Sequence, residues 1–239
     1  MPDPLNTPLS RIPKKAAGKP VHEGHRRRLR ERFAKTRLAG FQEYEILELL
    51  LSFAIPRRDV NPLAREAIRR FGTLADLLDA SGAELLELPG VGPNSVILIK
   101  LVRELVSRYL ETPLRRGNML ENREAVMRFI RAKLGGGKKE TLLVFFLGNR
   151  NRLLDWRIYP GTVDRSALFL REIAEHAVFC RATGVIAAHN HPSGCCEPSE
   201  EDRAFTRRLQ EAFGSLGVVL FDHFIASRCT TVSLLDGKK

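Results

Sequence analysis

The sequence predicts two domains of different class: an all-helical N-terminal domain and an α/β domain after it. From residue 23 to about residue 112, apolar residues recur with the spacing of amphipathic helices. Beyond residue 119, short apolar runs typical of buried strands alternate with further helical segments. A chain of 239 residues, 44% of them hydrophobic, is long enough to bury two modest cores.

The first 22 residues are rich in proline and in basic side chains, and they show neither helical nor strand periodicity. We expect a disordered basic arm. Residues 1–40 hold eleven Lys and Arg against three Asp and Glu, which is +8 of a total net charge of +11. Such a segment favours a polyanion partner such as nucleic acid, and a solvated tail without a partner is the alternative interpretation.

The helical domain is predicted over residues 23–112. Pro62 opens one of its helices and Gly72 closes it, as is common at helix ends. The other segments are "YEILELLLSFAI", "TLADLLDA" and "AELLELPGVGPNSVILIKLVRELVSRYL". Pro113 and Gly117 interrupt the helical pattern, so residues 113–118 are predicted to be a linker.

The α/β domain is predicted over residues 119–239. It begins with a helix, "REAVMRFIRAKL", which the glycines 135–137 end, and continues with two strands around a turn at Gly148. An amphipathic helix follows, "SALFLREIAEHAVFCRAT", with Gly184 as its stop. The remaining segments are the buried strand "VIAAH", the helix "SEEDRAFTRRLQEAFG", and the closing strands "VVLFDHFIAS" and "TTVSLL".

The stretch "LPGVG" places Gly90 and Gly92 between two helical patterns, with Pro93 at the start of the second. Unpaired backbone N–H groups at such a helix start can hold a phosphate oxygen without reading a base. The stretch resembles the helix-hairpin-helix motif of DNA-binding proteins without sequence specificity, which makes both glycines candidate DNA contacts. A tight turn in a hairpin that contacts protein is the alternative.

The stretch "AAHNHPSGCCEPSEED" carries the strongest chemical signal. His189 and His191 follow a strand at spacing i, i+2, so an extended backbone sends both imidazoles to one face. Asp202 lies in the first turn of the next helix, from which its carboxylate could approach them. Two imidazoles and one carboxylate suit Zn²⁺ and leave a fourth position for water. Ser199 and Asp202 also match a capping box, which is their alternative interpretation.

The combined pattern His-x-His-x7-Ser-x2-Asp resembles the JAMM (MPN+) metalloprotease motif, and together with the helical domain it resembles the RadC family. The stretches "GTV" (161–163), "LRE" (170–172) and "FDHFI" (221–225) extend the resemblance. It implies an MPN fold of the cytidine-deaminase-like kind, zinc on His189, His191 and Asp202, and a peptide or isopeptide substrate. It further implies a general acid/base glutamate, which we match to Glu140, and an oxyanion contact from Ser199.

Three further features of the sequence bear on the site. Glu172 is a second candidate for the general base. Cys195-Cys196 and Phe169-Leu170 depart from the family's pattern, so a thiol beside the metal and an altered substrate contact are expected consequences. Asp222-His223 is either an ordinary strand position or a pair that orients a ligand imidazole.

Other classes fit the sequence less well. There is neither the His-x-Glu with Pro-Cys-x-x-Cys of nucleobase deaminases nor the His-Glu-x-x-His of zincins. No apolar run reaches the length of about 20 residues that a membrane helix needs, and the N-terminus lacks a signal-like apolar stretch. We therefore expect a cytoplasmic protein with free thiols. The competing function is DNA binding or processing in repair, with a structural or nuclease-like zinc site.

Overall fold

The structure, a computed structural model, describes residues 21–161 and 166–235. The predicted arm, residues 1–22, lies outside the described residues except for Val21 and His22, with which the first helix begins. The chain divides into two compact units, Met1–Arg103 and Glu104–Lys239. None of the helices in the described part combines the length and the apolar composition that a membrane crossing requires.

The described part of the first unit is all-helical, as predicted. Pro62 lies in the first turn of its third helix, and Gly72, at φ 89°, is the C-cap of that helix. The buried side chains Leu47, Leu51 and Leu85 belong to one apolar core that these helices share. The helices are α1 (Val21–Thr36), α2 (Glu43–Ala54), α3 (Asn61–Phe71), α4 (Leu74–Asp79), α5 (Gly82–Leu86) and the first part of α6 (Pro93–Arg115).

The predicted linker at residues 113–118 is wrong in its position. Helix α6 continues through Pro113 to Arg115, and the two units divide within this helix, after Arg103. Leu114 is buried in the core of the second unit, and Glu111 pairs with Arg115 one turn later at 2.5 Å. Packing of this last turn outweighs the local preference of proline to end a helix.

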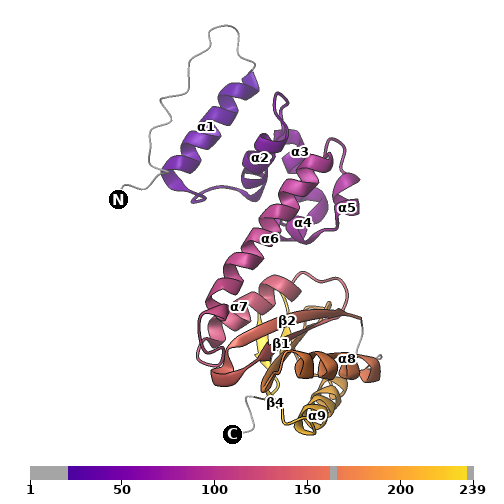
Figure 1. The fold of residues 1–239 in the computed structure, drawn as a ribbon. Helices are drawn as coiled ribbons and strands as arrows, with labels where there is room; N and C mark the ends of the chain where they lie inside the picture. Colours follow the sequence, from indigo (N-terminus) through magenta and orange to yellow (C-terminus); the bar gives the residue numbers. More distant parts are fainter. Residues whose placement is uncertain (1–20, 162–165, 236–239) are drawn as a thin grey trace, which may run out of the picture. The chain divides into compact units, whose positions relative to one another are not determined.

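The second unit is a mixed five-stranded sheet with helices on both faces (Figure 1). The strand order is β2-β1-β3-β4-β5, in which only β3 and β4 are parallel. Helix α9 makes the connection between these two strands. The elements are α7 (Arg123–Leu134), β1 (Thr141–Leu147), β2 (Leu153–Pro160), α8 (Ser166–Phe179), β3 (Gly184–Asn190), α9 (Glu200–Gly214), β4 (Val219–Ala226) and β5 (Thr231–Ser233).

Each face of the sheet has its own apolar core. Phe145 and Ile186 face α7, whereas Phe146 and Val185, one residue away in each strand, face α8 and α9. Every residue of β3 is buried, which agrees with the prediction of a short buried strand around "VIAAH". Because side chains alternate between the two faces along β3, residues two positions apart near the end of the strand lie on the same face.

The prediction that Gly184 ends the preceding helix is wrong. Helix α8 ends at Phe179, and Gly184 is the first residue of β3. A Cβ at Gly184 would lie 2.1 Å from the ring of Phe221. The glycine is therefore required for close packing between β3 and the start of β4 rather than for a turn.

Candidate metal centre

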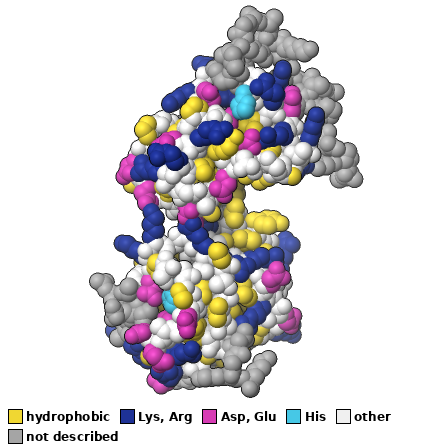
Figure 2. Space-filling view, turned by 180° about the vertical axis from the view of Figure 1, so that it is seen from behind, with side chains coloured by type: hydrophobic (Ala, Val, Ile, Leu, Met, Phe, Trp, Pro, Cys, Tyr) yellow, Lys and Arg dark blue, Asp and Glu magenta, His cyan; other side chains and the backbone are white. Residues whose placement is uncertain are grey.

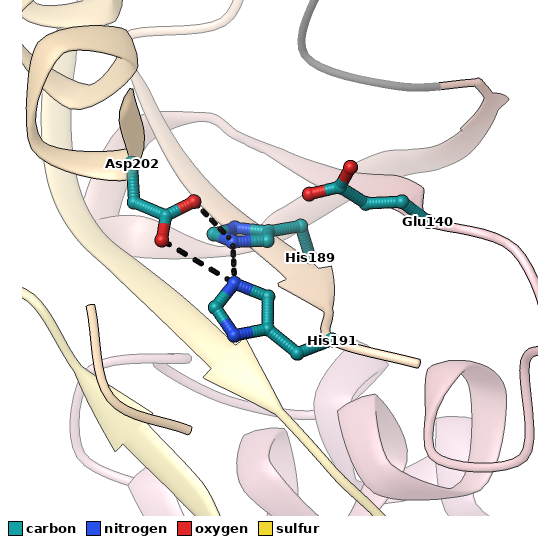
Figure 3. A group of neighbouring side chains, drawn as sticks. All are labelled: Glu140, His189, His191 and Asp202. Atoms are coloured by element: carbon teal, nitrogen blue, oxygen red, sulfur yellow. Dashed lines mark hydrogen bonds and ion pairs between the residues drawn. The ribbon is translucent and has the colours of Figure 1, made fainter. Parts of the chain in front are cut away.

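The two histidines of the motif leave the C-terminal end of β3 on the same side. His189 lies in the strand, and the backbone N–H of His191 donates to Ala226 O at 3.2 Å. The extended conformation thus persists one residue beyond Asn190, where the strand ends. Both imidazoles consequently point into one site on the α9 side of the sheet, as predicted (Figure 3).

Asp202 reaches the same site from the first turn of α9. Ser199 is the N-cap of this helix: its Oγ accepts from the Asp202 N–H at 3.1 Å, and Asp202 Oδ2 accepts from the Ser199 N–H at 2.8 Å. Asp202 Oδ1 lies 2.8 Å from His189 Nε2, and Oδ2 lies 3.3 Å from His191 Nε2. The capping box is present, and it is compatible with the ligand interpretation, because the cap directs the carboxylate at the imidazoles.

Four side chains converge in this cluster, with Glu140 as the fourth, and their candidate ligand atoms all lie within 4.8 Å of one another (Figure 3). The two Nε2 atoms of His189 and His191 are 3.1 Å apart. His191 Nδ1 lies 2.7 Å from the carbonyl oxygen of Cys195, which can only accept, so the neutral ring carries its proton there. Its Nε2 lone pair is left facing the cluster.

This donor set fits a metal ion. Two imidazole nitrogens beside one buried carboxylate are ligands that divalent transition metals prefer. Burial raises the pKa of Asp202, but its interactions with the His189 imidazole and its hydrogen bonds from Ser199 outweigh that effect and hold the pKa well below its usual value. The carboxylate is therefore ionised, as a ligand must be.

Glu140 precedes β1, which begins at Thr141 rather than at Glu140 itself. Among the described residues, no side chain or backbone group hydrogen-bonds its carboxylate, which points toward the histidines in Figure 3. The other candidate base, Glu172, is exposed on α8 and is not part of the cluster. The structure thus brings Glu140, and not Glu172, to the site.

Asn190 holds the segment that carries Glu140, a role that the sequence did not indicate. Its Oδ1 accepts from the Thr141 N–H at 2.8 Å, and its Nδ2 donates to Gly137 O at 3.2 Å and Lys139 O at 3.0 Å. As the residue between the two histidines, it points to the opposite side of the sheet. One stretch of β3 therefore presents the imidazoles on one side and fixes Glu140 from the other.

The two departures from the family's pattern lie outside the cluster. Cys195 is exposed and Cys196 partly buried, and neither thiol is among the four converging groups. Cys195 contributes only its backbone carbonyl, which accepts from His191. Leu170 packs against the core beneath α8, and the side chain of Phe169 lies outside the described residues.

The stretch "LPGVG" forms a tight turn between α5 and α6. Gly90 has φ 94°, a conformation that favours glycine, and α6 begins at Pro93 as predicted. A Cβ at Gly90 would lie 2.8 Å from Nη2 of Arg58, so the guanidinium group packs directly over the glycine. A Cβ at Gly92 would meet open space.

Comparison with known proteins places the site in a family. Residues 120–239 match the family model described as the RadC-like JAB domain. The chain is 33% identical to a UPF0758 protein of Fusobacterium nucleatum, over 90% of this chain and 96% of that protein. It is 35% identical to a UPF0758 protein of Ralstonia pickettii, over 92% of this chain and 97% of that one.

Proposed function

The chain belongs to the RadC family, and on that premise we propose that it is a zinc-dependent hydrolase of the JAMM type, acting on a peptide or isopeptide bond. The observation that carries the proposal is the convergence of three candidate ligand side chains with the carboxylate of Glu140, which no described group hydrogen-bonds. Three protein ligands leave a coordination position open, as catalytic rather than structural zinc sites do.

The residues divide the chemistry between them. His189, His191 and Asp202 would hold the zinc, which supplies the Lewis acidity that activates water and polarises the scissile carbonyl. Glu140 would accept the water's proton and deliver it to the leaving amine. Ser199 would donate to the developing oxyanion; its hydroxyl donates to Asp202 Oδ2 at 2.7 Å in the resting site, so it must turn to do so.

Removal of the metal tests this proposal. We expect the purified protein to carry about one zinc per chain, because one set of three ligands with an open position suits one Zn²⁺. Dialysis against a chelator should abolish cleavage of a peptide or isopeptide library, and added Zn²⁺ should restore it. The assay is fluorescence release from quenched substrates, with elemental analysis of the same samples.

A parallel assay on single- and double-stranded DNA distinguishes the proposed peptidase from the alternative, a nuclease-like zinc site. Two-metal nucleases use a pair of ions, whereas this cluster offers one set of ligands among the described residues. Zinc-dependent cleavage of DNA without cleavage of any peptide would contradict the proposal. Cleavage of peptide that survives complete removal of zinc would contradict it as well.

DNA binding by the first unit is a second candidate function, favoured by the turn at Gly90. The N-terminus of α6 and the exposed guanidinium of Arg58 meet at this turn, an arrangement that resembles a helix-hairpin-helix phosphate contact. Figure 2 shows Lys and Arg side chains spread across the face in view and interspersed with Asp and Glu. The proposal therefore depends on the turn rather than on a single basic stripe.

We expect weak, salt-sensitive binding to duplex DNA of any sequence, because phosphate contacts release counterions. Arg58→Ala should reduce the slope of log K against log salt by about 1, the value for one phosphate contact. Fluorescence anisotropy with random duplexes over a salt series measures this slope. Arg171→Ala is the control, since Arg171 pairs with Glu175 on α8. Equal slopes for both variants would remove Arg58 from the interface, and salt-independent binding would favour a protein contact.

A further inference from the structure

A chain of hydrogen bonds runs behind His189, on the side away from the candidate metal position. His223, fully buried in β4, has its Nε2 2.9 Å from His189 Nδ1. Its Nδ1 lies 2.7 Å from the hydroxyl oxygen of Thr206 in α9. The Thr206 hydroxyl lies 2.7 Å from the backbone carbonyl of Asp202, one helical turn earlier. The chain thus starts at one ligand and ends at the backbone of another.

The donor and acceptor in each bond follow from the bond at the end of the chain, between Thr206 and the Asp202 carbonyl. The Asp202 carbonyl can only accept, so the Thr206 hydroxyl donates its single proton to it. That hydroxyl must then accept from His223 Nδ1–H. A fully buried imidazole is costly to charge, and the neutral ring has one N–H, so His223 Nε2 accepts in turn from His189 Nδ1–H.

The consequence falls on the other nitrogen of His189. With its only proton on Nδ1, the neutral ring presents a lone pair at Nε2, 3.1 Å from Nε2 of His191 and 2.8 Å from Asp202 Oδ1. The opposite tautomer would place a proton on Nε2, where it would donate to Asp202 and occupy the ligand position. The chain behind His189 therefore decides whether the site offers a ligand or an internal hydrogen bond.

We propose that Thr206 and His223 are positioning residues that hold His189 in the Nδ1–H tautomer and thereby set the affinity of the site for zinc. This inference rests on the metal-binding part of the proposed function and not on hydrolysis. Histidine ligands commonly donate their second N–H to a carbonyl or a carboxylate. Here a second histidine accepts it instead, and a threonine from the ligand-bearing helix fixes the polarity of that histidine.

Thr206→Val removes the hydroxyl while keeping a side chain of similar shape. His223 Nδ1 then loses its acceptor, so His223 can change to the tautomer that donates from Nε2. His189 Nδ1 must accept that bond, which moves the proton of His189 to Nε2 of His189. We expect Thr206→Val to weaken zinc binding about 10- to 100-fold, the scale for removing a hydrogen-bond partner of a ligand. Thr206→Ser keeps the hydroxyl and should bind within about threefold of wild type on the same scale.

The experiment is a competition titration of the full-length, metal-free protein with Zn²⁺ and a chromophoric chelator at fixed pH. Nitrogen-15 NMR of histidine-labelled wild-type protein reports the tautomers of His189 and His223 directly, so a Thr206→Val protein that fails to fold does not decide the matter. Equal affinities for wild type and Thr206→Val, or an Nε2–H tautomer of His189 in the zinc-bound wild type, would overturn the inference. A folded wild-type protein without zinc affinity would overturn the metal-binding proposal itself.

Discussion

Replacing His191 with alanine is expected to reduce zinc affinity by more than about 100-fold, because losing a ligand exceeds the cost of losing a ligand's hydrogen-bond partner. Among the three proposed ligands, this histidine isolates the metal's contribution best. Asp202 also caps α9, and His189 is buried in the sheet, so changing either disturbs the fold. Among the described residues, the polar contacts of the His191 side chain are with the cluster and with the Cys195 carbonyl.

Thermal unfolding with and without zinc gives a second measure of this effect. Zinc at about 100 times its Kd stabilises the native protein by about 2.7 kcal/mol, which raises the unfolding temperature. We expect that rise in wild type and its loss in His191→Ala, while the two zinc-free proteins unfold at similar temperatures. A variant that keeps the zinc-dependent rise would show that His191 is not a ligand.

The matched control replaces Cys195 and Cys196 together by serine. Neither thiol belongs to the cluster, and the bond that orients His191 comes from the backbone carbonyl of Cys195, which serine retains. We expect zinc content and the zinc-dependent stabilisation to stay at wild-type values. A large loss in this double variant would assign a ligand role to one of the thiols.

The sequence predicted which histidine and aspartate side chains converge, because their geometry is local. The i, i+2 spacing of His189 and His191 on a strand and the helix start before Asp202 fix most of the arrangement within 14 residues. The order of helices and strands could also be predicted, because the spacing of apolar residues within each segment indicates a helix or a strand. The fold class and the convergence of these three side chains therefore follow from short-range patterns.

The sequence indicated His223 as a residue that could orient a ligand imidazole, but it indicated none of the other supporting residues, because their partners lie far away in the chain. Asn190 bonds to Gly137 and Lys139, about 50 residues earlier, and nothing local distinguishes it from an ordinary strand residue. Thr206 lies on a helix face beside Phe205 and Leu209, so the sequence pattern indicates only that it is a buried core position. The end of helix α6 was predicted wrongly for the same reason, because Leu114 packs in a core formed mainly by later residues.

The second large expected effect is a loss of hydrolysis when the proposed general base, Glu140, is replaced. Glu140→Gln is expected to keep zinc bound yet lower the rate of hydrolysis about 10²–10⁴-fold, the usual contribution of a positioned acid/base group. The amide has nearly the same shape as the carboxylate but cannot accept a proton from water. Since no described group hydrogen-bonds the Glu140 carboxylate, the substitution leaves no partner unsatisfied and should not disturb the fold.

Glu172→Gln is the matched comparison, because Glu172 was the other candidate and is exposed on α8, outside the cluster. Rates on the substrate found with the quenched library, measured at equal zinc content, should fall for Glu140→Gln alone. Asn190 holds the segment of Glu140 through three hydrogen bonds, so Asn190→Ala alone should show an intermediate loss, and in the double variant it should add nothing to the loss caused by Glu140→Gln. Full activity in Glu140→Gln, with a zinc-loaded but inactive Glu172→Gln, would transfer the role to Glu172 and require α8 to approach the metal.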